Sequence, residues 1–208
     1  LGRLADAEEI YQEVLVYYQT SGNVVWQANL LNNLGVLHYQ VGDYAKALNE
    51  LERSIQYARL GGYQRLEAYA LSSLGDLFRN LKLIREAEEV FQKSVQIDHE
   101  IEDHFLHFYL QYSLADLALA RRTIKKAKDT LAQAAEIAQC AGSTYEIHLC
   151  SMLRGKIAWE SGDYESALVE FSQALAFFET GHQVEANRCR LLAVTASAAS
   201  GKFDQTRE

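Results

Sequence analysis

The chain has 208 residues, 49% of them hydrophobic and 23% charged, a composition that excludes an intrinsically disordered protein. Its 28 acidic and 20 basic residues give a net charge of −8, which disfavours nucleic acid and anionic membranes as partners and favours a basic or neutral partner. Three cysteines without paired spacing, no signal-peptide pattern and no apolar stretch of membrane-spanning length indicate a cytoplasmic protein without disulfides.

The predicted helices come in pairs that recur every 40 residues. In the stretch 28–62, small and apolar residues at helical spacing form two runs separated by a Gly42-Asp43 break, which predicts two amphipathic helices joined by a tight turn. The first run, followed through its later copies, reads Leu31, Leu34, Gly35, His38; Leu71, Leu74, Gly75, Phe78; Leu114, Ala115, Ala118; and Gly155, Ala158. The second run reads Ala47, Leu51, Ser54; Ala87, Phe91, Ser94; Ala127, Leu131, Ala134; and Ala167, Phe171, Ala174.

This period predicts one continuous array over 1–208 rather than separate domains. Residues 1–22 match a second helix, and Leu191 and Val194 match a first helix whose partner is cut short. We therefore expect the chain to be a segment of a longer protein. Its parts are a half repeat at 1–22, full repeats at about 23–62, 63–102, 103–142 and 143–182, and a half repeat at 183–208.

Turn residues support these helix boundaries independently of the apolar pattern. Asp43 and Asp163, each after a glycine, are N-cap acceptors directly before a second helix. Between repeats, glycines stand where a helix end needs a left-handed residue, with the last one a residue early in phase. These glycines are Gly22, Gly62, Gly142 and Gly181.

Small residues mark the predicted close contact inside each hairpin. Counted from Ala28 as the first position, the eighth position holds Gly35, Gly75, Ala115 and Gly155. We expect the alanines at the twentieth position to lie opposite them, and the large residues at the twenty-fourth position to fill the space toward the next repeat. A large side chain at either small position would overpack the hairpin.

A small eighth residue, Ala at the twentieth position and an apolar or aromatic twenty-fourth residue resemble the tetratricopeptide repeat. Three departures are the 40-residue length in place of about 34, the absence of proline, and Arg154 at the seventh position, where Leu34, Leu74 and Leu114 stand in the other repeats. The resemblance implies an all-α fold, a right-handed α-solenoid of antiparallel helix hairpins that is not an enzyme and needs no cofactor. Long proline-free units also look like the arrays of bacterial transcription regulators of the signal-transduction ATPase and LuxR-like classes.

In the family, side chains at positions two, five, nine and twelve of the first helices line a concave groove. Carried onto this chain, the resemblance gives a groove rich in aromatic and hydrogen-bonding groups, suited to an extended peptide. The alternative is that Tyr109, Tyr112 and Trp159 fill the core between repeats. The predicted groove residues are Asn29, Asn32, Tyr39, Tyr69, Ser72, Asp76, Arg79, Tyr109, Tyr112, Asp116, Met152, Lys156 and Trp159.

Charged residues suggest what the ligand carries. Asp76 and Asp116 share one phase of the repeat, so we expect a stacked acidic pair that selects a cationic group. The alternative is a charge cluster that Arg79 and Lys156 already satisfy. A basic run at Arg121, Arg122, Lys125, Lys126 and Lys128 is interpreted as a solvated surface, with contact to phosphate or an acidic domain as the alternative.

No pattern for catalysis or metal binding is present. His99, His104 and His107 lack the spacing of a zinc-binding helix, and the sequence has neither a phosphate-binding loop nor a nucleophile elbow. We therefore predict a non-catalytic scaffold that binds a peptide or partner protein, within a bacterial transcription or signalling regulator. The alternatives are a small-molecule sensor in such a regulator and self-association through the exposed terminal repeats.

Overall fold

The computed structural model describes residues 2–200, and between these residues it contains ten α-helices and no strand. The prediction of an all-α fold is confirmed. The helices are α1 (Gly2–Thr20), α2 (Val24–Val41), α3 (Tyr44–Leu60), α4 (Gln64–Asn80), α5 (Ile84–Ile101), α6 (His104–Ala120), α7 (Ile124–Ala141), α8 (Thr144–Glu160), α9 (Tyr164–Phe178) and α10 (Gln183–Ala199).

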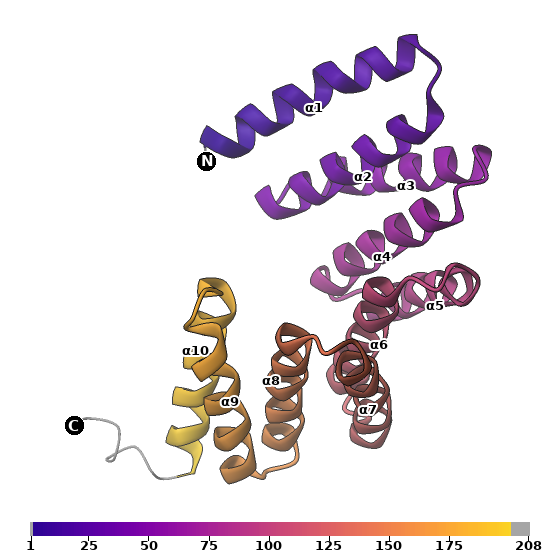
Figure 1. The fold of residues 1–208 in the computed structure, drawn as a ribbon. Coiled ribbons are helices and arrows are strands. Elements are labelled where there is room, and N and C mark those ends of the chain that lie inside the picture. Colours follow the sequence, from indigo (N-terminus) through magenta and orange to yellow (C-terminus); the bar gives the residue numbers. More distant parts are fainter. Residues whose placement is uncertain (1, 201–208) are drawn as a thin grey trace. The chain divides into compact units, whose positions relative to one another are not determined.

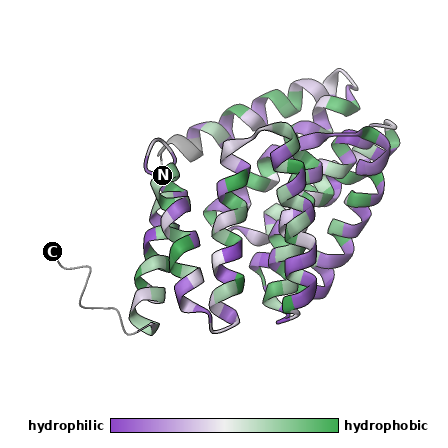
Figure 2. Ribbon diagram, turned by 60° about the horizontal axis from the view of Figure 1, so that its bottom comes forward, coloured by the Kyte–Doolittle hydropathy of each residue, from purple (hydrophilic) through white to green (hydrophobic). Residues whose placement is uncertain are grey.

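The chain forms two compact units, Leu1–Leu106 and His107–Glu208. Within each unit, successive helices are joined by short turns and run antiparallel (Figure 1). In the first unit α2 packs on α3 and α4 on α5, and in the second α8 packs on α9. Hydrophobic and hydrophilic residues are interspersed along the helices (Figure 2), and buried apolar residues gather in clusters between neighbouring helices. The fold is therefore a series of helix hairpins, as the period predicts.

The helix ends follow the turn chemistry that the sequence predicts. Asp43 Oδ1 accepts a hydrogen bond of 3.2 Å from Lys46 N at the start of α3, and Asp163 Oδ1 accepts one of 3.1 Å from Ser166 N at the start of α9. Left-handed residues recur with the 40-residue period even where glycine is missing. They are Gly22, Gly62, Glu102 and Gly142 between hairpins, and Gly42, Lys82, Arg122 and Gly162 within them.

The prediction for Gly181 is wrong, because this residue is not in the left-handed region. Helix α9 has 15 residues and ends at Phe178, and its C-cap residue Glu179 has a right-handed conformation. The amide of His182 then returns to the carbonyl of Phe178 at 2.8 Å, which closes the turn without a left-handed residue.

The close contact inside each hairpin lies between the eighth and the twenty-fourth positions. A Cβ atom added to Gly75 would lie 2.6 Å from Phe91 Cε1, and one added to Gly155 would lie 2.5 Å from Phe171 Cε1. An alanine of the twentieth position also lies opposite the glycine, since the carbonyl oxygen of Ala47 would lie 3.3 Å from a Cβ added to Gly35. The alanines at this position are fully buried, but the large residue one helical turn later covers the glycine.

A serine near the middle of α3 and its copy in α5 fix the second helix to the first helix of its own hairpin. Ser54 Oγ donates to the carbonyl oxygen of Ala28 at 2.7 Å, and Ser94 Oγ donates to that of Ala68 at 2.7 Å. Both serines are fully buried. A side-chain donor therefore satisfies a backbone acceptor in the core at the same phase of both repeats.

Candidate functional site

A cavity of about 620 Å³ opens in the first unit between the first helices α2 and α4. Three residues predicted from sequence to line the groove come together here, namely Asn29, Asn32 and Tyr69. They come from equivalent faces of the two helices, since Asn29 and Tyr69 occupy the same position of successive repeats. The remaining lining residues are Val25, Asn33, Gly62, Tyr63, Gln64, Arg65, Leu66 and Ile101.

The cavity has asparagine amides on its α2 side. Asn33 Nδ2 donates to Asn29 Oδ1 at 3.3 Å, so the amide oxygen of Asn29 already has a hydrogen-bond partner on its own helix. Asn32 Oδ1 is buried and has no hydrogen-bond partner among the described residues. An asparagine amide that faces the cavity can accept an N–H and donate to a carbonyl, the pair of groups that an extended peptide backbone presents.

A polar cluster fixes the α4 side of the cavity. Tyr69 Oη donates to Asp103 Oδ2 at 3.1 Å, and Arg65 Nη2 lies 2.7 Å from the same oxygen. Arg65 also lies over the Tyr69 ring, 5.9 Å from its centroid. Asp103 Oδ1 accepts from the amide of Leu106, so the same carboxylate also caps α6. The Tyr69 ring is thereby held at the cavity wall by two neighbours.

The electrostatics of this cluster follow from burial and hydrogen bonding. Burial raises the pKa of the Tyr69 hydroxyl, so this group stays a hydrogen-bond donor at neutral pH. Burial alone would raise the pKa of the Asp103 carboxyl, but hydrogen bonds from the Leu106 amide and Tyr69, together with the Arg65 guanidinium, lower it. The cluster is therefore an ionised acid with three donors around it.

The other predicted residues of the first unit lie outside the cavity. Tyr39 packs against Tyr44 with ring centroids 6.5 Å apart. Ser72 is 5% exposed and belongs to the buried polar residues. Asp76 Oδ1 contacts Arg79 Nη2 at 2.8 Å, so this carboxylate faces a cation of its own helix.

In the second unit, several predicted groove residues contribute to packing. Met152 is 3% exposed and lies in the core with Phe178, Ala186 and Cys189, so its assignment to the groove is wrong. The reason is that α10 packs over α9 and α8 at this point and covers the fifth position. Tyr112 packs against the core beside Phe108.

The remaining four residues of that set are half-buried. Trp159 meets Tyr164 edge to face at 4.9 Å and also packs against a core cluster. Asp116 Oδ1 lies 3.3 Å from Lys156 Nζ. Tyr109 lies on the same helix as Asp116 and lines none of the cavities described here. Each predicted acidic residue therefore contacts a basic side chain, which is the alternative that the sequence left open.

Sequence analysis missed a buried charged cluster in the first unit. His38 is 1% exposed, and its ring nitrogens contact Glu50 Oε2 at 2.5 Å and Glu8 Oε1 at 3.0 Å. Burial alone would lower the pKa of the imidazole, but the hydrogen bonds to both carboxylates raise it. The signal in the sequence was a histidine at a position that holds Phe78, Ala118 or Ala158 in the other repeats.

Comparison with known proteins agrees with this geometry. Two tetratricopeptide repeat family models match the chain, one over residues 1–60 and the other over residues 68–100. The chain contains tetratricopeptide repeats. The first match covers α1 to α3 and the second covers most of α4 and α5. The repeats of this type form non-catalytic scaffolds, in agreement with the prediction that the chain is not an enzyme.

One curated relative and several solved structures resemble the repeats. The regulatory protein RapG of Bacillus subtilis (strain 168) is 23% identical over 145 residues, which are 69% of this chain and 40% of RapG. The chain thus spans less than half the length of that relative. No helix between residues 2 and 200 combines the length and the apolar character needed to cross a bilayer.

The solved structures share the fold at low sequence identity. A Rap protein complexed with competence and sporulation factor superposes with a TM-score of 0.75 at 16% identity, over 97% of this chain and 61% of that one. BtubC from P. vanneervenii gives 0.72 at 16% identity, over 98% of this chain and 84% of that one. Apo RapI gives 0.69 at 13% identity, over 97% and 72% of the two chains.

Proposed function

We propose that this chain is a protein-binding scaffold of a bacterial regulator, and that the cavity between α2 and α4 holds an extended peptide or partner segment. The observation that carries the proposal is the cavity itself, which Asn29 and Asn32 of α2 line together with Tyr69 of α4, whose ring Arg65 and Asp103 hold in place. A hydrogen bond between an asparagine amide of the wall and a peptide backbone contributes about 0.5–1.5 kcal/mol.

The cavity walls supply the other parts of such a site. Tyr69 is held in place by Arg65 and Asp103, so it offers a rigid aromatic surface at low entropic cost. Val25, Leu66 and Ile101 add apolar contacts for alternate side chains of the peptide. The likeness to RapG and to a Rap protein solved with competence and sporulation factor supports a regulatory role for the parent protein.

The proposal does not include a cationic group on the partner, because Asp76 and Asp116 each contact a basic side chain of the chain itself. Self-association through the terminal repeats remains a prediction from the sequence. A small-molecule effector is the second candidate, since about 620 Å³ lies within the range of about 300–1,000 Å³ that is usual for small-molecule sites.

Peptide selection tests the first candidate. A display library of random short peptides is panned against the chain, and the selected peptide is titrated into variants by calorimetry. We expect Asn32→Ala and Tyr69→Ala each to weaken binding about tenfold, because each removes an interaction worth about 1.4 kcal/mol. Asn49→Ala, which truncates an exposed asparagine on the second helix α3, is the matched control.

Thermal melts of the same variants separate loss of binding from loss of folding. Peptides that bind Asn32→Ala and Tyr69→Ala as tightly as the parent chain would contradict the proposed site. A library that yields no binder, together with a metabolite that binds and loses affinity in the same two variants, would favour the small-molecule alternative.

A further inference from the structure

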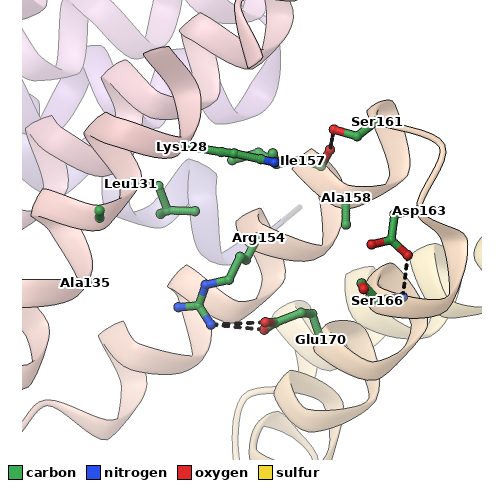
Figure 3. A pocket seen from close by; sticks show the side chains of 11 residues that line it. Lys128, Leu131, Ala135, Arg154, Ile157, Ala158, Ser161, Asp163, Ser166 and Glu170 are labelled. Atoms are coloured by element: carbon green, nitrogen blue, oxygen red, sulfur yellow. Dashed lines mark hydrogen bonds and ion pairs between the residues drawn. The ribbon is translucent and has the colours of Figure 1, made fainter. Parts of the chain in front are cut away.

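A second pocket lies in the second unit, on the side of the second helices. It has a volume of about 390 Å³ and is bounded by α7, α8 and α9 (Figure 3). We call it the α7–α9 seat. Leu131 and Ile157, at 3% and 2% exposure, form its apolar floor. The other lining residues are Lys128, Ala132, Ala135, Arg154, Ala158, Ser161, Asp163, Ser166 and Glu170.

The equivalent space of the first unit is filled. Subtracting 80 from each residue number moves the seat onto α3, α4 and α5, where the corresponding side chains are large and apolar. Ile55, Leu74 and Val90, which are 6%, 6% and 8% exposed, occupy it together with Phe78. The residues in the seat at these four positions are Ala135, Arg154, Glu170 and Ala158.

The same place one repeat earlier is filled in a different way. Subtracting 120 puts His38 at the position of Ala158, Glu8 at that of Lys128 and Glu50 at that of Glu170. The buried His38 contacts both carboxylates there, so a charged cluster with a partly exposed Glu8 occupies the space. In both of these copies, side chains of the chain itself fill the space between the three helices, whereas the same space in the α7–α9 seat is open.

An ion pair holds one wall of the seat open. Arg154 Nη1 contacts both carboxylate oxygens of Glu170 at 3.2 Å, and the arginine side chain is 47% exposed. Figure 3 shows Arg154 directed toward Glu170. Leucine at this seventh position packs into the core at Leu34 and Leu74, so the arginine removes an apolar side chain that the other repeats place there.

The charges at the edge indicate the chemistry of an occupant. Both acidic residues of the seat are engaged, Glu170 by Arg154 and Asp163 by the amide of Ser166. On α7, Lys125 and Lys128 are exposed and share a helix face with Ala132, at spacings of three and four residues. The first two turns of α7, with Lys125, Lys126 and Lys128 against Asp129, therefore place a net positive charge beside the apolar floor, and Lys128 also interacts electrostatically with Asp163.

We propose that the α7–α9 seat docks a partner protein segment that inserts one aromatic or branched aliphatic side chain and places acidic residues against Lys125 and Lys128. The apolar side chain takes the volume that Phe78 and Ile55 fill in the first unit. The carboxylates of the docked segment form charge-assisted contacts with Lys125 and Lys128. This surface is separate from the cavity between α2 and α4, so the two proposals fail independently.

The proposal is tested with short capped peptides and methyl-labelled protein. The probes are Asp-Asp-Phe-Asp-Asp, the same peptide with alanine at its centre, and Lys-Lys-Phe-Lys-Lys. We expect the acidic phenylalanine peptide alone to shift the methyl resonances of Leu131 and Ile157, with an affinity that falls as salt rises. Shifts with the basic peptide, or none with any peptide at millimolar concentration, would overturn the proposal.

Two sets of variants make the assignment specific. Ala158→Phe copies Phe78 into the seat, and Ala135→Ile copies Ile55 as a smaller filling in case the phenylalanine disturbs folding. We expect either to reduce peptide affinity at least tenfold without lowering the melting temperature. Lys125→Glu with Lys128→Glu should reduce it similarly, whereas Lys93→Glu, at an exposed lysine on α5, should not. Undiminished binding by the filled variants contradicts the docking site.

Discussion

Replacing Gly75 with leucine is expected to lower the melting temperature by about 2–12 °C, because an overpacked core costs about 1–3 kcal/mol and each kcal/mol shifts a domain of this size by about 2–4 °C. A Cβ at this position lies 2.6 Å from Phe91 Cε1 and 2.7 Å from Phe91 Cζ, so even the first added carbon displaces the ring. Phe91 is fully buried and has no open space to move into. Differential scanning calorimetry measures the effect.

A matched control separates overpacking from the loss of a glycine. Gly181 has no atom within 4 Å of an added Cβ and does not adopt a left-handed conformation. Gly181→Leu should therefore melt within a few degrees of the parent chain. Equal melting temperatures for the Gly75 and Gly181 variants would show that the hairpin contact is not as close as described.

Stability of the first unit is expected to fall as the pH rises above about 6.5, the usual pKa of histidine. The pKa of His38 is raised in the folded state, despite burial, by hydrogen bonds to Glu50 and Glu8. A raised folded pKa means that the folded state holds the proton more tightly than the unfolded state. Its stabilising contribution is complete below pH 6.5 and is lost as the pH passes the folded pKa.

The other charged groups around His38 do not change this sign above pH 6.5. Burial raises the pKa of Glu50 while its contact with His38 opposes the shift, and the hydrogen bond to His38 lowers the pKa of Glu8. Lys46 lies 3.8 Å from Glu8, and Asp43 lies 3.4 Å from Lys46. The hydrogen bond from the Lys46 amide lowers the pKa of Asp43, so this carboxyl stays ionised across this window.

Urea unfolding between pH 6 and pH 9 measures the effect. His38→Gln keeps a hydrogen-bond donor but does not titrate, so its stability should stay level where that of the parent chain falls. His99→Gln, at an exposed histidine on α5, should retain the fall. A parent chain whose stability does not change over this range would contradict the raised pKa of His38.

The fold could be predicted from the sequence because each hairpin repeats its own boundary signals. Asp43 and Asp163 cap helices as expected, and the left-handed turns keep their phase even where Glu102 and Arg122 replace glycine. Gly181 shows the limit of this reasoning. A glycine near a helix end permits a left-handed turn but does not require one, and here the backbone closes without it.

The site was harder to predict because one residue of helix rotation moves a side chain by about 100°. Position five is half-buried at Asn32 and Tyr112 but buried at Ser72 and Met152, so it lies at the border between the surface and the core between repeats. Whether a residue at position five is exposed or buried depends on the neighbouring helix, and residues of α10 cover Met152. Repeat phase alone does not contain this information.

Side-chain contacts between residues of different repeats also could not be predicted from the sequence. Asp103 belongs to a histidine-rich stretch, yet its partners Arg65 and Tyr69 lie more than 30 residues earlier. His38 occupies a core phase, and only the structure shows that Glu8 and Glu50 accompany it. The open α7–α9 seat likewise becomes visible only when its alanines are compared with the filled space in the first unit.

The most direct test of the proposed function is to map the binding site of a selected peptide by amide chemical-shift changes in the labelled chain. We predict that the largest changes fall on Asn29, Asn32, Arg65 and Tyr69, around the cavity between α2 and α4. Changes that leave these four residues unaffected and gather elsewhere on the first unit would contradict that assignment.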